Sequence, residues 1–427
     1  MRAPLALVVA GTLGLAACQA DDVTPSAPTP MSAASAQENL LTLVPEPALN
    51  GAQRGLLATI RGRPSTAEVH LARIAAAPGR MLRPGAALRL GIAPGVQVVA
   101  VGERVQERAA SDISWAGPLR GAEGWVQMVL ADGGVTASVH VGHTLYSIEP
   151  LGNGLHAISR IDQGGFPADH PAEHPSGALG DAMDAAADEL LSARSADLGT
   201  IGAESTTQIN VMVVYTAAAA SATSNIGSLI QLAVDETNQS YVNSGVNINM
   251  VRVHTAQVTY NEANRSFSQH VSALRSTTDG IMDVVHSWRN TYAADVVVLV
   301  VNDSEACGMA AAIKATATTA FAAAHYTCIT GYYSFGHEIG HLQGARHDRF
   351  VDSSNTPYQY GHGFIPSAKN WRTIMAYGNN CSNCTRIQWW SNPNKTYPST
   401  GQVMGTTTYE DNARVLNTTA ATVAGFR

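Results

Sequence analysis

The segment 336–348 reads G-H-E-I-G-H-L-Q-G-A-R-H-D, and it constrains the fold more than any other part of the chain. His337 and His341 are four residues apart, so on a helix both imidazoles project from one face about one turn apart. Gly344 can take the left-handed conformation that ends a helix, and the following turn brings His347 back toward the same face. We therefore predict a helix that stops at Gly344 and three histidines around one metal ion.

This ligand set also predicts chemistry. Three protein ligands leave the fourth position of a tetrahedral zinc ion open, which is typical of catalytic sites. Glu338 follows the first ligand and can face a water molecule on the metal. We interpret Glu338 as the general base that takes a proton from this water. The resulting hydroxide attacks a carbonyl polarised by Zn²⁺, and Glu338 then returns the proton to the leaving amine. The motif predicts one catalytic zinc ion and hydrolysis of peptide bonds.

Other histidines of the chain have simpler interpretations. We interpret His270, His325 and His362 as hydrogen-bonded core or surface residues. A closed structural zinc site would need a fourth protein ligand next to the motif. Asp348 is better placed to form local hydrogen bonds than to bind the same ion. The sequence offers no support for a structural calcium ion, which stays an open option.

Length and composition indicate how many folded units to expect and which classes of protein are excluded. The chain has 427 residues, beyond the roughly 250 to 300 at which single hydrophobic cores stop growing, so we expect two folded units. It is 45% apolar and 14% charged, as expected for a protein that builds cores and not for a disordered or membrane-embedded chain. The net charge of −7 argues against nucleic acid as a partner.

The first 18 residues, M-R-A-P-L-A-L-V-V-A-G-T-L-G-L-A-A-C, are typical of a bacterial export signal. A charge at Arg2 precedes an apolar run that is too short to span a bilayer permanently. The ending L-A-A-C resembles a lipoprotein signal, in which Cys18 is lipidated. An ordinary secretory signal cut near Ala20, with Cys18 discarded, is the alternative. We expect export, either as a secreted protein or as an outer-membrane lipoprotein whose only membrane contact is its lipid.

Composition divides the rest of the chain into four stretches. Residues 19–39 read as a flexible tether, and 40–162 alternate short apolar runs with Gly and Pro, which predicts a β-rich domain with a hairpin turn at Gly133-Gly134. Residues 163–205 are rich in Ala, Pro and carboxylates, and we interpret them as an acidic, protease-accessible linker with the maturation site, where 178–194 could form a polar helix. Residues 206–427 form the second domain.

The second domain alternates strand and helix patterns. Strands are predicted over 208–215, 246–253 and 294–301, with edge-like segments at 309–313 and 320–325 and helices over 226–241, 268–292 and 411–423. The run 296–301, V-V-V-L-V-V, is expected of a strand buried on both faces. We predict an α/β (α+β) domain with a mostly parallel twisted sheet, followed by a loop-rich half.

At the histidine motif the sequence resembles the metzincin metalloproteases, in which H-E-x-x-H-x-x-G-x-x-H is followed by a methionine turn beneath the metal. The segment T-I-M-A-Y at 373–377 matches this turn and makes Met375 the floor of the site. Asp348 after the third histidine is similar to the adamalysin (reprolysin) branch. Tyr377 stands where astacins and serralysins carry a tyrosine that binds the metal or the oxyanion, which implies a catalytic role here.

A closer resemblance covers 206–427. The motif together with Y-G-H-G at 360–363, W-R-T-I-M-A-Y at 371–377, W-S-N-P at 390–393 and D-N-A-R-V-L-N at 411–417 is similar to the bacterial peptidyl-Asp metalloendopeptidases. This resemblance implies a secreted zinc enzyme with a propeptide, which cleaves proteins on the amino side of Asp. Such a preference requires a cation in the pocket. Arg372 and Arg386 flank the methionine turn and are the candidates, with ordinary surface arginine as the alternative.

The β-rich segment 40–162 ahead of a linker suggests a prodomain, as the resemblance also implies. It would assist folding or block the cleft as an intramolecular inhibitor. No cysteine occurs between Cys18 and Cys307, which argues against a cysteine on the zinc as the inhibitory device. The segment G-F-P-A-D at 165–169 is similar to the aspartate latch of astacin propeptides, so Asp169 could cap the zinc, and His170 or His174 could also bind it. A solvated acidic linker is the interpretation that we favour for this segment.

Four cysteines remain in the second domain. A bond between Cys307 and Cys328 would brace the strand that binds the substrate backbone in metzincins, and a bond between Cys381 and Cys384 would fix the loop after the methionine turn. The C-x-x-C pair could alternatively be a redox pair or half of a zinc site. Its exported location favours a structural disulfide.

These observations predict an exported, monomeric zinc endopeptidase that acts on protein or peptide substrates. The alternative is a binding lipoprotein that uses a catalytically degenerate protease domain for docking. An intact Glu338 argues against this alternative, because a pseudoenzyme does not need the general base.

Overall fold

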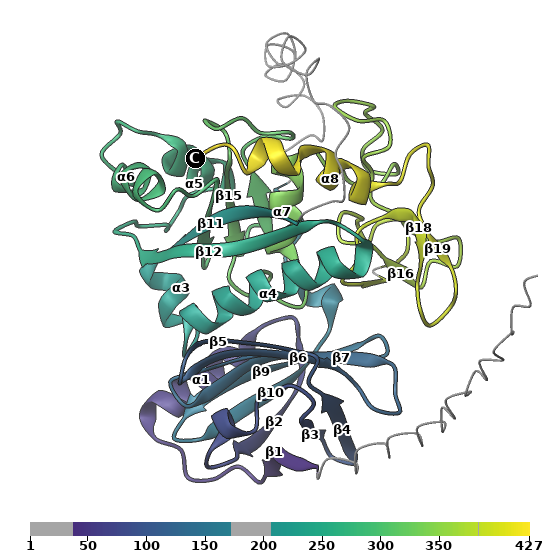
Figure 1. Cartoon of the computed structure of the whole chain (residues 1–427). Helices are drawn as coiled ribbons and strands as arrows, with labels where there is room; N and C mark the ends of the chain where they lie inside the picture. Colours follow the sequence, from purple (N-terminus) through teal and green to yellow (C-terminus); the bar gives the residue numbers. More distant parts are fainter. Residues whose placement is uncertain (1–36, 172–205, 383) are drawn as a thin grey trace, which may run out of the picture. The chain divides into compact units, whose positions relative to one another are not determined.

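The computed structural model of the chain describes residues 37–171, 206–382 and 384–427 (Figure 1). The predicted signal peptide, Cys18, most of the tether, His174, the maturation site and the polar helix over 178–194 lie outside these residues. Across the described ranges, no helix is both long and apolar enough to cross a bilayer.

Residues 38–161 form one ten-stranded sheet with the order β4-β3-β1-β2-β10-β9-β8-β7-β6-β5. The strands are β1 (Glu38–Val44), β2 (Thr66–Ile74), β3 (Ala87–Ala93), β4 (Val96–Val101), β5 (Arg104–Ala109), β6 (Asp112–Pro118), β7 (Gly124–Ala131), β8 (Gly134–Val141), β9 (Thr144–Gly152) and β10 (Leu155–Ile161). Neighbours are antiparallel except β1 and β3. The turn between β7 and β8 has positive φ at Asp132 and Gly133, one residue earlier than predicted.

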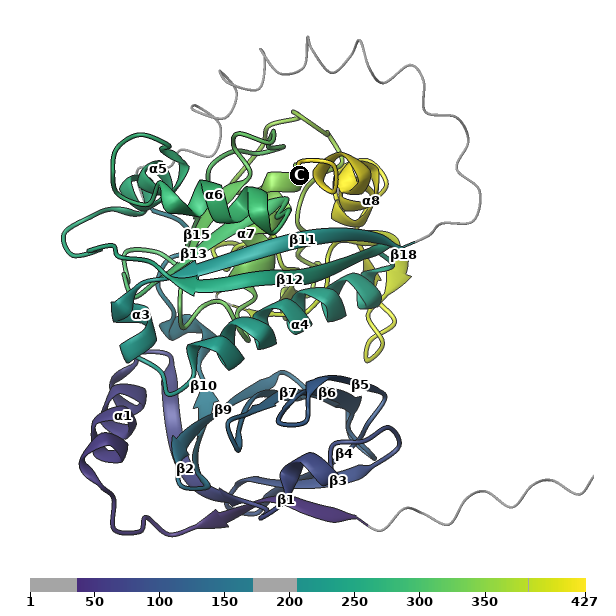
Figure 2. The same cartoon turned by 60° about the vertical axis from the view of Figure 1, so that its left-hand side comes forward.

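The sheet curls so that strands far apart in its order share a core (Figure 2). Ala100 at the end of β4 forms a bridge to Leu119 after β6. Trp115, Val126 and Leu90 belong to the same buried cluster. Helix α1 (Gly51–Gly62) starts with a capping box at Asn50 and packs its apolar residues on a second, smaller cluster. A 3₁₀ turn lies at Pro78–Arg80.

The second sheet has five strands in the order β12-β11-β13-β15-β14. They are β11 (Thr207–Tyr215), β12 (Ile248–Gln257), β13 (Val296–Val301), β14 (Gly308–Ala310) and β15 (Phe321–His325). The first four in this order run parallel, and only β14 is antiparallel to its neighbour. All six residues of β13 are buried, because helices cover both faces. The predicted mixed α/β class is confirmed.

Helices α4 (Ile226–Ser244), α7 (Ser334–Gln343) and α8 (Asn412–Val423) pack on one face of this sheet, while α5 (Phe267–Arg275) and α6 (Val284–Thr291) pack on the other (Figures 1 and 2). A short helix, α3 (Ala217–Ser221), follows β11. The single helix predicted over 268–292 is wrong. Its middle contains T-T-D-G, and Gly280 has a φ of +75°, so a turn separates α5 from α6.

The second half is mostly loop. Parallel pairing of β16 (Trp371–Arg372) with β17 (Thr385–Arg386) makes Arg372 and Arg386 direct neighbours. Strands β18 (Asn392–Thr396) and β19 (Val403–Met404) form another small ladder. Both predicted disulfides, Cys307–Cys328 and Cys381–Cys384, are present.

The ten-stranded sheet contacts polar groups on helix α4 and on the loop after β17. The side-chain amide of Gln127 on β7 donates to the backbone oxygen of Asp235 at 3.2 Å, and Gln388 donates to Gln127 Oε1 at 2.8 Å. Residues 162–171 follow β10, and we call them the connecting segment. They begin with a 3₁₀ turn at Gln163–Gly165.

Candidate active site

Helix α7 carries the first two histidines of the motif. All ten of its residues are buried. Its C-cap, Gly344, has a φ of 103° in the left-handed region, and Gly344 N–H donates to His341 O at 2.8 Å. The predicted helix stop is confirmed, and the reversal after Gly344 returns His347 to the helix.

The three histidines converge through their Nε2 atoms. The distance is 3.1 Å between His337 and His341, 2.9 Å between His341 and His347, and 3.3 Å between His337 and His347. Ligands about 2.05 Å from a tetrahedral zinc lie roughly 3.3 Å apart. The spacing of the three nitrogen atoms therefore suits one ion bound by all three.

The hydrogen bonds of the rings support a metal in the same place. His337 Nδ1 lies 2.9 Å from Ile374 O, and His341 Nδ1 lies 2.9 Å from Ala345 O. A carbonyl only accepts, so both Nδ1 atoms carry the proton and both Nε2 atoms present lone pairs to the centre. Burial lowers the pKa of His337 and His347 well below 6.5, which keeps the neutral, ligating form. The donor set fits a zinc ion.

Glu338 lies beside this cluster in a closed environment. Its side chain is 1% exposed, and Oε2 lies 3.2 Å from His170 Nε2. Oε1 is buried without a hydrogen-bond partner among the described residues. Burial raises the pKa of Glu338, and the nearby His170 opposes this shift. An orphaned carboxylate oxygen next to three histidine nitrogens is the arrangement that a general base for a water molecule requires.

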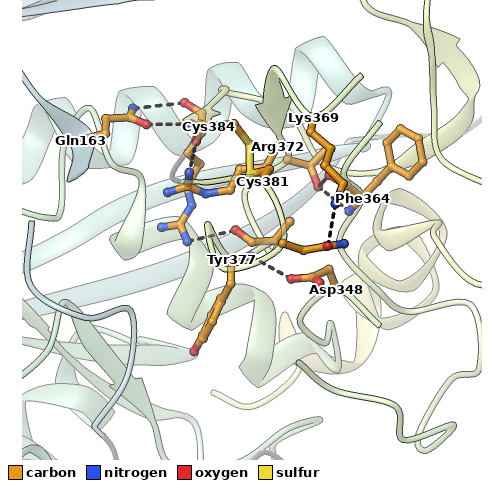
Figure 3. The surroundings of a disulfide bond; sticks show 12 residues. Gln163, Asp348, Phe364, Lys369, Arg372, Tyr377, Cys381 and Cys384 are labelled. Atoms are coloured by element: carbon orange, nitrogen blue, oxygen red, sulfur yellow. Dashed lines mark hydrogen bonds between the residues drawn. A yellow bond between two sulfur atoms is a disulfide. The ribbon is translucent and has the colours of Figure 1, made fainter. Parts of the chain in front are cut away.

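Met375 and Tyr377 complete the walls of the site. Met375 is fully buried, and its Sδ would lie 3.2 Å from a Cβ at Gly340 of α7, so it packs directly under the helix. The ring of Tyr377 lies 4.3 Å from that of His347. Its backbone N–H donates to Asp348 Oδ2 at 2.8 Å (Figure 3). Asp348 therefore anchors the segment that carries Met375. Its Oδ1 also accepts from Phe350 N–H at 3.1 Å, the local hydrogen bond that was expected.

Both arginines at the methionine turn are 1% exposed, so the surface interpretation is wrong for both. Arg386 donates through Nη1 to Tyr332 O at 3.2 Å and through Nη2 to Ala376 O at 3.2 Å. Its guanidinium also lies 4.2 Å from the centre of the Tyr332 ring. Arg372 donates to Cys384 O (Figure 3). It also donates to the Tyr332 hydroxyl at 3.1 Å. Arg386 is thus fixed beside the metal-binding residues, with Arg372 supporting it.

The connecting segment lies along the site instead of in solvent. Gln163 exchanges hydrogen bonds with the backbone of Arg386, donating at 3.2 Å and accepting at 2.7 Å. Phe166 packs on Tyr332 with ring centres 4.6 Å apart. Asp169 Oδ1 accepts from Arg386 Nη2 at 2.6 Å, and the Asp169 side chain is 8% exposed. The favoured interpretation of 163–171 as solvated linker is therefore wrong.

The structure distinguishes between the two described residues that could have capped the metal. Asp169, expected to cap the metal, binds Arg386, while His170 contacts Glu338 and Tyr377 and lies among the three histidines. Two further residues support the site, and their sequence spacing from the histidine motif did not predict this role. His362 Nδ1 lies 2.7 Å from His347 O, and Gly308 leaves room for Glu338. His270 and His325 are buried, as core histidines are expected to be.

Three histidines from a helix and its returning turn, with a carboxylate beside them and a methionine beneath, define a metallopeptidase. The profile described as Metallo-peptidase family M12 (Reprolysin_5) matches residues 205–391. The chain is 45% identical to a peptidyl-Asp metalloendopeptidase of Stenotrophomonas maltophilia (strain K279a) over 300 residues, 69% of this chain and 68% of the relative.

A peptidyl-Asp metalloendopeptidase of Xanthomonas campestris pv. campestris is 42% identical over 77% of this chain and 74% of its own. One from Pseudomonas fragi is 43% identical over 45% of this chain and all of its own. The chain belongs to the peptidyl-Asp metalloendopeptidase family. It is a metalloendopeptidase that acts on protein or peptide substrates, and the docking lipoprotein is not favoured.

Proposed function

We propose that the protein is a zinc endopeptidase that cleaves peptide bonds on the amino side of Asp. The observation that carries this proposal is the ion pair between Arg386 and Asp169. Both side chains are buried beside the three candidate histidine ligands. We take the surroundings of Arg386 as the pocket for the residue after the scissile bond, and an aspartate side chain already fills it. The names of the relatives point to the same residue preference.

The pocket suits a short carboxylate for physical reasons. Arg386 is fully buried, and its guanidinium is held by two backbone oxygens and by the face of Tyr332. A cation in this setting needs an anion, because a buried unpaired charge costs several kcal/mol. The fixed position of the guanidinium determines how long the side chain of its partner can be. The Asp169 side chain reaches Nη2 while the Asp169 backbone stays bonded to β14. Asn would leave the charge uncompensated.

The catalytic steps are assigned to residues around the histidines. When bound by His337, His341 and His347, zinc supplies the Lewis acidity that lowers the pKa of water and polarises a carbonyl. Glu338 accepts the proton of the attacking water and delivers it to the leaving amine. Burial raises the pKa of Tyr377 well above 10, so its hydroxyl remains a donor for the negative charge that develops on the substrate oxygen.

The Asp preference is tested by kinetics on peptide pairs that differ only in Asp or Asn after the scissile bond. In Arg386→Ala we expect the ratio of kcat/KM values to fall by roughly 100-fold, the loss typical of a buried charge pair. Arg386→Lys should recover part of the preference. Arg265→Ala, an arginine stacked on Tyr260, is the matched control. An unchanged Asp preference in Arg386→Ala would overturn the proposal.

We further propose that the chain is an exported precursor, with residues 40–162 as its prodomain and a maturation cut within the linker 163–205. Two disulfides in the described domain support an oxidising compartment. N-terminal sequencing of the active enzyme, together with mass spectrometry of Cys18, tests the cut and the lipid anchor. An active enzyme that still carries 40–162 would contradict the prodomain.

A further inference from the structure

The connecting segment brings a fourth imidazole to the metal-binding histidines. The ring centre of His170 lies 5.2 Å from that of His337, 5.1 Å from His341 and 4.8 Å from His347. One potential ligand atom from each of the four lies within 4.8 Å of the others. The side chain of His170 is 10% exposed. His170 therefore lies at nearly equal distances from all three ligands, over the side of the cluster that they leave open.

The hydrogen bonds of His170 resemble those of the three candidate ligands. His337 and His341 each have Nδ1 fixed by a carbonyl oxygen, and Nδ1 of His170 lies against the hydroxyl oxygen of Tyr377, which can accept its proton in the same way. Fixing Nδ1 in this way orients a ring and leaves Nε2 to bind a metal. Nε2 of His170 lies 3.2 Å from Glu338 Oε2, so it occupies the place where the general base would meet its water.

The backbone on the amino side of His170 is anchored as well. Cys307 N–H donates to Ala168 O at 2.7 Å, and Gly308 N–H donates to Asp169 O at 3.2 Å. Together with the ion pair to Arg386, these bonds hold the residue before His170 by both its main chain and its side chain. The position of His170 is thus set by neighbours that bind the segment, and not by its own ring alone.

We propose that His170 is the fourth protein ligand of the metal ion in the uncleaved chain, which makes the precursor site a closed four-histidine site. This inference rests on the proposed function, because it concerns the regulation of the same metal site. A fourth protein ligand leaves no position for water or a scissile carbonyl. The ring also lies against Glu338 and Tyr377, so neither side chain is accessible to a substrate. Asp169 fills the specificity pocket meanwhile, so the segment blocks both halves of the site.

The test uses the full chain loaded with Co²⁺ and carrying Glu338→Gln, so that it stays uncleaved. Azide enters an open coordination position and changes the visible spectrum of Co²⁺. We expect azide to leave the spectrum of this parent unchanged and to change that of the parent with His170→Ala. His70→Ala, in the ten-stranded sheet, is the matched control and should behave as the parent. A parent that responds to azide as His170→Ala does would overturn the proposal.

A second measurement needs no substitution at His170 and so does not depend on how that variant folds. Zinc K-edge absorption of the zinc-loaded parent should give four imidazole ligands and no oxygen. Three imidazoles and one oxygen would overturn the proposal and leave His170 as a contact of Glu338 and Tyr377 only. Both measurements read the metal without a substrate. A mature enzyme without Asp preference would refute the proposed specificity but would not change the result of either measurement. A precursor metal site with an open position would refute the fourth ligand but would leave the proposed specificity untouched.

Discussion

Gly308 and Glu338 are packed so closely that any side chain at position 308 would displace the Glu338 carboxylate. A Cβ at Gly308 would lie 2.3 Å from Glu338 Oε1 and 2.7 Å from its carboxyl carbon. Gly308 opens β14, the edge strand that also binds the connecting segment. The edge strand therefore determines where the catalytic carboxylate can lie.

Gly308→Ala should lower kcat without destabilising the protein. The added methyl group meets the flexible end of Glu338 and displaces it from the position of a general base, so we expect a loss of roughly 10- to 100-fold in kcat. Thermal unfolding should change little, since no backbone atom is among the closest contacts. Gly227→Ala, which meets only an ordinary contact at 3.4 Å, is the control. Wild-type kcat in Gly308→Ala would refute the steric argument.

Glu338→Gln should separate metal binding from catalysis. The three histidines keep their Nδ1 partners and their spacing, so the variant should retain wild-type zinc per chain. Loss of the proton acceptor should lower kcat by about 10²- to 10⁴-fold. Zinc content by atomic absorption and initial rates on an Asp peptide check both expectations. A variant that loses both zinc and activity would instead make Glu338 a structural residue of the site.

The Cys381–Cys384 disulfide should affect substrate binding more than stability. Cys384 O accepts from Arg372, the β16 partner of Arg386 in β17. The double Cys→Ser variant loosens this oxygen, so we expect a KM for Asp peptides several-fold higher with kcat little changed. Steady-state kinetics on the Asp and Asn pair measures the effect. Equal changes in kcat and KM would show that the loop acts on the chemistry as well.

The Cys307–Cys328 disulfide should matter mainly for stability. It joins residues 21 apart in sequence, and a loop of this size corresponds to about 3 kcal/mol in the chain-entropy account. The double Cys→Ser variant should lose about this free energy of unfolding in urea. The shorter Cys381–Cys384 loop provides the comparison and should cost less. Two equal losses would contradict the dependence on loop length.

His156 should make the stability of the precursor depend on pH. It is fully buried, accepts a hydrogen bond from Val135 N–H at 2.9 Å, and burial lowers its pKa to about 4. In the unfolded chain it titrates near 6.5, so between these values only the unfolded state binds the proton. The free energy of unfolding should therefore fall as pH drops from 6.5 to 4, by on the order of 3 kcal/mol.

Urea unfolding of the full chain at several pH values between 4 and 7 measures this slope. His156→Gln removes one titrating group and should reduce the slope by its share, whatever its effect on stability at neutral pH. His140 and His325, whose pKa burial also lowers to about 4, keep the remainder. His143→Gln, at an exposed position, is the matched control and should keep the wild-type slope. An equally steep slope in His156→Gln would assign the pH dependence to other groups.

The parts of the site that follow from local sequence were predictable. His337 and His341 share a helix face by their spacing, and Gly344 ends that helix because glycine alone adopts its φ without strain. The buried run of β13 likewise reflects composition alone. Such features need no knowledge of distant residues.

The remaining features depend on partners far along the chain. Arg386 looks like a surface residue until Asp169, 217 positions earlier, supplies its counter-ion. The different positions of Asp169 and His170 have a similar cause. Neighbouring side chains of an extended segment point in different directions, so the register of its backbone against Cys307 and Gly308 decides which one faces the histidines. No pattern within 163–171 specifies this register.

The pairing of Arg386 with Asp169 has a consequence for how this family can diverge. If one guanidinium both selects the substrate and holds the connecting segment, its replacement changes the cleavage preference. The same replacement also weakens the binding of the inhibitory segment. A lineage that acquires a new preference must then acquire a matching residue at position 169. Positions 169 and 386 should therefore change together among relatives, and the residue before His170 should report the preference of the mature enzyme.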